Sequence, residues 1–196
     1  LTERTRRLAR QWPRTVPHDG VEVFDSDEAV AFALPGRPGR VVVSTGMLRR
    51  LTPNQQAALV AHERAHLAGR HHRYLTATAI AAAAVPVLRP LERRVRHATE
   101  RSADEAAARE VGSRRMVADA IARAALGPGA RLSGAAGMAE VGAAARVAAL
   151  LSPAPTPRQR AITAVTGAFV VIPGLLGAVI QLHHTGSFAA HVCPPS

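Results

Sequence analysis

The residues of this sequence best suited to chemistry are His62-Glu63-Arg64-Ala65-His66, which have the form HExxH. On a helix, His62 and His66 stand one turn apart on the same face, so both imidazoles can bind one metal ion. Glu63 lies beside them and is free to act as the catalytic general base toward a water molecule. The alternative is a chance pattern on a solvated helix of a chain with nine histidines. We favour a zinc site with one Zn2+ per chain, because helix signals surround the motif.

Those signals define both ends of the motif helix. Thr52 is a candidate N-cap, Pro53 suits the first helical position, and Gln55 completes a capping box by reaching back to the Thr52 amide. Gly69 is a plausible stop at the carboxyl end. The sequence therefore predicts a helix that carries the whole motif.

A catalytic zinc ion needs a third protein ligand and keeps one position open. Glu100, on a second predicted helix from about Leu91 to Val111, is the preferred candidate. Asp104 lies one turn further along a face of small residues, where it can hydrogen-bond the free nitrogen of a ligand histidine. His97 is the rival ligand, and a surface carboxylate paired along its own helix is the alternative interpretation of Glu100.

Composition favours helices packed through small side chains. The chain has 196 residues and 47% hydrophobic content, enough for a core, but only 3% aromatic residues. The core must therefore be built from Ala, Val and Leu. The net charge is +11, and all 25 basic residues are arginine. Because neither interleaved aromatic residues nor a DNA-reading motif accompanies it, we expect no nucleic-acid partner.

Before the motif helix, residues 21–24, 29–34 and 40–45 alternate or cluster apolar residues like short strands, with a turn at 35–39. We expect these strands to form a small antiparallel sheet. An edge strand beside the metal helix is where an extended peptide substrate can add itself through backbone hydrogen bonds.

After the motif, residues 74–88 are uncharged and rich in alanine. A helix of that length spans about 22 Å, short of the roughly 30 Å hydrocarbon core, so we expect a buried or membrane-dipping helix. Further helices are predicted at 114–126, capped by Ser113, and at 135–151.

The 22 residues 161–182 carry no charge, which is long enough to span a bilayer; a buried hairpin of a soluble core is the alternative. All 25 arginines and all 14 acidic residues precede residue 161. The positive-inside rule then predicts a cell-membrane protein whose catalytic domain faces the cytoplasm. The expected organisation is a zinc metallopeptidase domain at 1–160, a transmembrane helix at 161–182 and a short tail at 183–196.

Four segments together resemble a known family: 31–36, 41–48, His62–His66 and Glu100–Asp104. They resemble the integral-membrane gluzincin metallopeptidases, the HtpX/Ste24-like proteases and the BlaR/MecR-like antirepressor peptidases, over roughly residues 21–112. The resemblance implies an α+β, mainly helical zincin-like fold, with zinc held by His62, His66 and Glu100. It also implies Glu63 as general base and hydrolysis of protein or peptide substrates by a membrane-anchored endopeptidase. No oligomeric state is predicted.

The sequence departs from that family in one respect. Such proteases often carry a later His-Pro and Arg element that assists the transition state, but Ser152-Pro153 stands where His-Pro is expected, and Arg158 or Arg160 is an ambiguous match to the Arg. The transition-state stabiliser is therefore unassigned.

Two alternative functions stay open: a sensor-transducer that cleaves a transcriptional repressor, and a non-catalytic, Arg-rich membrane or nucleic-acid binding protein. His71 and His72 either support the metal site or form a solvated helix end.

Overall fold

The structure is a computed structural model and describes residues 20–126 and 136–153. The chain divides into two units, residues 1–153 and 154–196, and the fold described here belongs to the first unit. The predicted transmembrane segment 161–182 and the tail 183–196 lie outside the described residues, as do Arg158 and Arg160. Among the helices that are described, none is both long enough and apolar enough to cross a bilayer.

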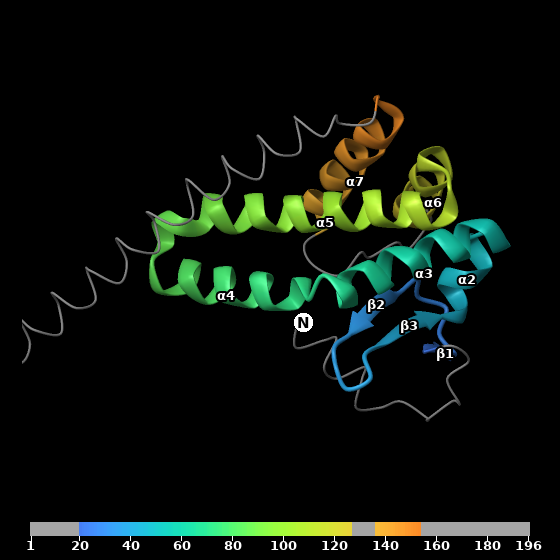
Figure 1. Cartoon of the computed structure of the whole chain (residues 1–196), viewed down its shortest axis with the longest axis horizontal. Coiled ribbons are helices and arrows are strands. Elements are labelled where there is room, and N and C mark those ends of the chain that lie inside the picture. The colour runs from blue at the N-terminus through green and yellow to red at the C-terminus, as the bar shows by residue number, and fades with distance from the viewer. Residues whose placement is uncertain (1–19, 127–135, 154–196) are drawn as a thin grey trace, which may run out of the picture. The chain divides into compact units, whose positions relative to one another are not determined.

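A three-stranded sheet opens the described part of the chain (Figure 1). Its strands are β1 (Val21–Phe24), β2 (Ala31–Leu34) and β3 (Arg40–Ser44), in the order β1-β3-β2. β2 pairs antiparallel with β3, whereas β1 pairs parallel with it, so the prediction of a purely antiparallel sheet was wrong for one pair. Residues 25–30 carry the chain from one edge of the sheet to the other, which gives β1 and β3 the same direction.

Ser44 fixes this crossing segment to the end of the central strand. Its hydroxyl donates to the Glu28 carbonyl at 2.6 Å and accepts from the Val30 amide at 3.0 Å. It also accepts from the Met47 amide at 3.0 Å, as the N-cap of α2 (Thr45–Arg50). The sequence pattern does not predict α2, because six residues are too few for helical periodicity to be recognised.

The motif helix, α3 (Pro53–Ala68), begins as predicted. The Thr52 amide donates to Gln55 Oε1 at 3.0 Å, and Pro53 occupies the first turn, where its missing N–H costs nothing. The predicted capping box is therefore confirmed.

Helix α3 also ends where predicted, at Gly69, but the left-handed residue of the turn is not this glycine. The left-handed residue is Arg70, with φ of 49°, while Gly69 has ordinary helical angles. Glycine is needed at position 69 because a Cβ there would collide with the His71 ring. This tight turn starts α4 (His71–Ala84) and holds His71 against the end of α3.

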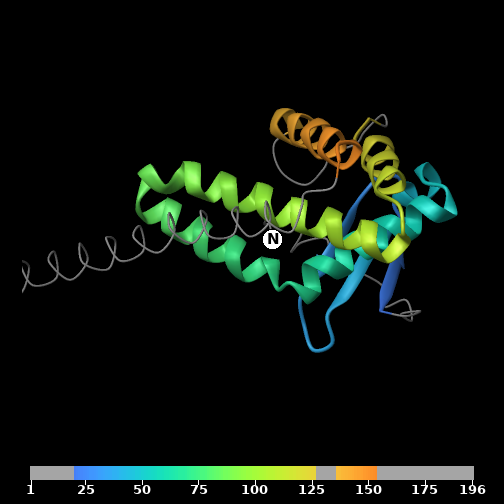
Figure 2. The same ribbon diagram turned by 45° about the horizontal axis from the view of Figure 1, so that its top comes forward.

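α4 continues through a short 3-10 turn, η1 (Pro86–Leu88), into the long helix α5 (Arg89–Val111). α4 and α5 lie side by side as a helical hairpin (Figures 1 and 2). The helix predicted at 74–88 thus begins three residues earlier, at His71, and breaks at Val85, ahead of Pro86.

α6 (Arg114–Leu126) and α7 (Ala136–Leu151) complete the described part of this unit. The Met116 amide donates to Ser113 Oγ at 3.2 Å, which confirms the predicted cap. The helical core consists of small and aliphatic residues from α3, α5, α6 and α7, as the low aromatic content predicted: Ala58, Ala61, Ala107, Ala108, Val117, Ala118, Ala120 and Leu150.

Candidate metal centre

Small residues bring α3 and α5 together. On α5, Ala103 and Ala107 are fully buried, and Ala107 packs in one cluster with Ala58 and Ala61 of α3. Side chains no larger than a methyl group let two helices approach closely. The ligand candidates on the two helices therefore face one another across a short distance.

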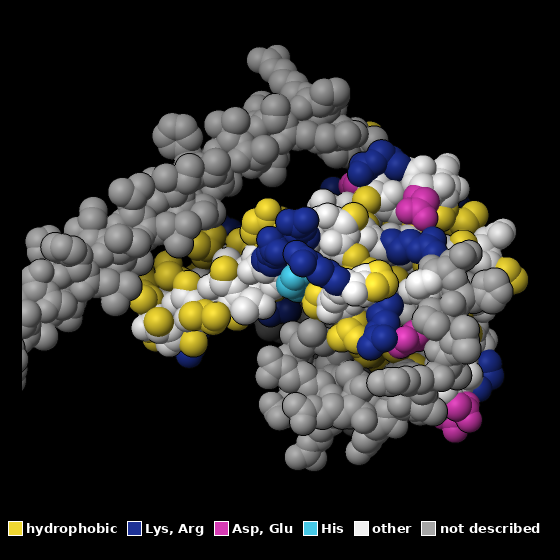
Figure 3. Space-filling view, turned by 60° about the horizontal axis from the view of Figure 1, so that its bottom comes forward, with side chains coloured by type: hydrophobic (Ala, Val, Ile, Leu, Met, Phe, Trp, Pro, Cys, Tyr) yellow, Lys and Arg dark blue, Asp and Glu magenta, His cyan; other side chains and the backbone are white. Residues whose placement is uncertain are grey.

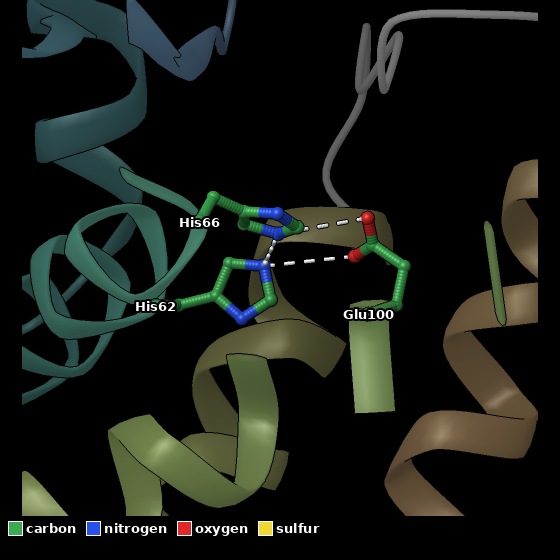
Figure 4. Close-up of side chains that lie close together, drawn as sticks. All are labelled: His62, His66 and Glu100. Carbon is green, nitrogen blue, oxygen red and sulfur yellow. Dashed lines mark hydrogen bonds and ion pairs between the residues drawn. The ribbon is translucent and has the colours of Figure 1, made fainter. Parts of the chain in front are cut away.

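His62 and His66 of α3 point toward Glu100 of α5 (Figure 4). The two Nε2 atoms are 3.1 Å apart, and each lies 3.6 Å from a different oxygen of Glu100. One ligand atom from each of the three residues lies within 4.8 Å of the others. The rival ligand His97 is exposed and is not part of this group.

These residues fit a zinc ion. Bonds of about 2.0 to 2.1 Å in a tetrahedral arrangement separate neighbouring ligand atoms by about 3.3 Å. The observed separations of 3.1 and 3.6 Å are close to that value. Two imidazoles and one carboxylate are also a ligand set of catalytic zinc sites, which leave a fourth position for reactants. The structure thus contains a group of three residues that can bind a metal ion.

Asp104 lies where the sequence analysis expected it, against a ligand histidine. Its side chain is fully buried, and Oδ1 is 3.0 Å from His62 Nδ1. Since the Nε2 atom of the same ring faces Glu100, the two carboxylates bracket His62 from opposite sides. A carboxylate on the outer nitrogen fixes the ring orientation of a metal-binding histidine.

Arg146 of α7 is the residue that sequence reasoning missed. Its Nε and Nη2 atoms contact Asp104 at 2.8 and 2.6 Å, and Nη1 lies 2.9 Å from Glu100 Oε2. It therefore offsets part of the negative charge of these two carboxylates. Nothing in the sequence distinguishes it from the other arginines, because its role arises from the packing of α7 against α5.

A third histidine joins the two on α3. His71 is buried, and its Nδ1 lies 2.9 Å from His66 Nδ1, so one ring donates to the other according to the tautomers present. Of the two histidines that follow the motif helix, the structure brings His71 to the centre. The turn at Gly69 and Arg70 produces this contact.

The electrostatics of the centre give the two histidines opposite protonation. Burial by itself lowers the pKa of His62, but the carboxylates of Asp104 and Glu100 outweigh it and raise this pKa to about 9. Burial lowers the pKa of His66 to about 4, despite the opposing charge of Glu100. Burial also opposes ionisation of Glu100, yet His62 and Arg146 lower its pKa to about 2. In the metal-free centre, one imidazolium and one neutral imidazole thus share the site.

Glu63 lies next to the two ligand histidines along α3 and is half-buried. Burial raises the pKa of Glu63 above its ordinary value, against the lowering effects of His62 and of a backbone hydrogen bond from Ala33. A raised carboxyl pKa brings the group closer to the pH at which a general base works. The Ala33 contact also connects Glu63 to strand β2.

A glutamate beside two histidines on one helix, with a second glutamate from a neighbouring helix, is the arrangement of a metallopeptidase centre. Comparison with known proteins agrees with this class: the model of peptidase family M48 matches residues 1–88. The matched part includes His62, Glu63 and His66 and ends before Glu100. Members of this family are metal-dependent peptidases, so the match supports a metallopeptidase of family M48. No solved structure matches the chain.

Proposed function

We propose that this protein is a zinc-dependent endopeptidase that hydrolyses peptide bonds in protein substrates. The observation that carries the proposal is the convergence of His62, His66 and Glu100, whose ligand atoms lie within 4.8 Å of one another, beside Glu63. The family match supports the same chemistry independently of this geometry.

When bound, a zinc ion supplies Lewis acidity to the reaction. The chain contributes the rest. Glu63 takes a proton from the attacking water and passes it to the leaving amine, for which its raised pKa is suited. Asp104 and Arg146 hold His62 and Glu100 in place through the contacts described above. Arg146 acts in this proposal as a positioning residue, and the transition-state stabiliser stays unassigned.

Strand β2 offers a position for an extended substrate. It forms an edge of the described sheet and packs beside α3. Its Ala33 backbone already contacts Glu63, so a peptide added along this edge would pass close to the general base. Backbone pairing of this kind recognises any extended chain and leaves sequence preference to side-chain pockets. A protein or peptide substrate follows from this arrangement.

The proposal includes attachment to the cell membrane, with the peptidase domain on the cytoplasmic side. It is supported by the 22 uncharged residues at 161–182 and by the restriction of all arginines to the preceding part of the chain. A repressor-cleaving role of the BlaR/MecR type is the second candidate. The sequence HERAH and the short interval between His66 and Glu100 resemble that type, whereas the strand before the motif helix resembles the HtpX-like proteases.

The decisive experiment measures zinc content and peptidase activity together. The detergent-purified full chain is compared with Glu100→Gln and with Glu92→Gln, a matched change on the same helix at a residue paired with Arg96 at 3.2 Å. We expect about one zinc per wild-type chain by elemental analysis. Zinc and casein cleavage should be lost in Glu100→Gln and kept in Glu92→Gln. Wild-type zinc retention in Glu100→Gln would refute the three-ligand site.

A further inference from the structure

The outward face of helix α4 is unusual for a protein surface. Between Arg73 and Arg89 the chain carries no charged residue, yet most of this segment is exposed. The exposed fractions of the large apolar side chains reach 59% at Tyr74, 65% at Ile80 and 78% at Val87. We call the exposed residues of this segment the hairpin face: Tyr74, Thr76, Ala77, Ala79, Ile80, Ala83, Ala84, Val85, Pro86 and Val87.

An ordinary surface helix places charged and polar residues toward water. The partner helix α5 does so, with exposed Arg93, Arg94 and Arg96 along the first half of its length. Figure 3 shows the contrast: hydrophobic side chains are prominent at the end of the described unit that the hairpin forms, and most basic side chains lie elsewhere on this face. The apolar character therefore belongs to one arm of the hairpin.

The charge around the hairpin face is predominantly positive. Within residues 70–99 there is one acidic residue, Glu92, which pairs with Arg96 at 3.2 Å. The same stretch contains six arginines, all exposed: Arg70, Arg73, Arg89, Arg93, Arg94 and Arg96. An apolar surface flanked by cations matches a lipid bilayer with anionic headgroups, which offers both an apolar interior and negative phosphates.

We propose that the hairpin face lies in the headgroup region of an anionic membrane, with α4 parallel to the membrane plane. Fourteen helical residues extend about 21 Å, too short for the roughly 30 Å hydrocarbon core. Arg73 and Arg89 stand at the two ends of the apolar run, so a parallel orientation keeps both guanidinium groups near the phosphates. This contact is additional to any anchoring by residues 161–182.

Local depth measurements test the proposal separately from other anchors. Single nitroxide labels are placed at Ile80→Cys, Val87→Cys and Leu151→Cys in a full chain carrying Cys193→Ser. Leu151 is the matched control, since it is 59% exposed and lies at the end of α7. Collision with oxygen and with a water-soluble nickel complex is measured on phosphatidylcholine vesicles with and without 30% phosphatidylglycerol, and on the protein in solution at low detergent.

On anionic vesicles, labels at positions 80 and 87 should gain oxygen collisions and lose nickel collisions at least threefold, while the label at 151 stays unchanged. Replacing both Arg93 and Arg94 with Gln should weaken the effect. Labels at 80 and 87 that stay open to nickel on anionic vesicles would overturn the proposal. Labels already shielded from nickel without lipid would also overturn it, because another segment or a second copy then covers the hairpin face. Zinc content and peptidase activity do not enter this test, so it can fail independently of the proposed function.

Discussion

The guanidinium of Arg146 contacts both carboxylate oxygens of Asp104, at 2.8 and 2.6 Å, and thereby joins α7 to α5 directly behind the candidate ligand His62. Two parallel contacts between a guanidinium and a carboxylate define the relative orientation of the two planar groups as well as the distance between them. Because Asp104 is fully buried, loss of its partner leaves an uncompensated charge in the interior.

Arg146→Ala should therefore lower the free energy of unfolding by about 3 kcal/mol. Urea denaturation of the chelator-treated protein measures this change. Arg123→Ala, at an exposed position on α6, is the matched control and should alter stability by less than about 0.5 kcal/mol. Equal effects of the two substitutions would show that the pair with Asp104 contributes little.

Glu63→Gln should keep zinc and lose at least about a hundredfold in peptidase activity, since it removes the base but no ligand. Zinc content by elemental analysis and casein cleavage are measured on the same preparation. Arg64→Gln, one residue further and 44% exposed, is the control and should retain activity. Full activity of Glu63→Gln would sink the proposed mechanism.

His71→Ala should weaken zinc affinity by about tenfold, because the ring that lies against His66 Nδ1 would be lost. His72→Ala changes the neighbouring histidine and should leave the affinity nearly unaltered. Competition with a chromophoric chelator gives both affinities. If the two variants bind zinc equally well, His71 does not position His66.

The pH dependence of the chelator-treated protein follows from the two ligand histidines. The pKa of His62 is raised to about 9, so its contribution to stability is complete below its ordinary pKa of 6.5 and is lost as pH rises through 9. The pKa of His66 is lowered to about 4, so its contribution is complete above 6.5 and is lost as pH falls toward 4. Stability should therefore be greatest near pH 6.5, as measured by thermal unfolding between pH 4 and 9.

The alkaline part of that curve is assigned to one residue. In His62→Gln the loss of stability between pH 6.5 and 9 should disappear, because no imidazolium is left to deprotonate in this window. An unchanged alkaline loss in this variant would assign the titration to another group.

Local signals in the sequence were sufficient to predict the motif helix α3 and the helix α5 that carries Glu100. The capping box at Thr52 and Gln55, the one-turn spacing of His62 and His66, and the small-residue face around Asp104 each depend on neighbours within one or two helical turns. Such short-range regularities can be recognised without tertiary information.

Other features depend on contacts between distant segments. The direction of β1 follows from the crossing segment 25–30. This segment is hydrogen-bonded to Ser44, which lies at the end of β3. The contact of His71 with His66 requires a left-handed Arg70, a conformation that the residue type disfavours. The role of Arg146 requires α7 to pack on α5. Arg146 is 42 residues away from its partner Asp104 along the chain. None of these has a signature in the local pattern.

The separation of Arg146 from His62 by 84 residues has a consequence for biosynthesis. A ribosome releases the two histidines of α3 first, Glu100 later and Arg146 last, so the nascent chain holds only part of the centre for most of its synthesis. Asp104 and Glu100 gain their compensating cation only when α7 has emerged and packed. The contacts that Arg146 makes with Asp104 and Glu100 therefore form only after nearly the whole of this unit has been synthesised.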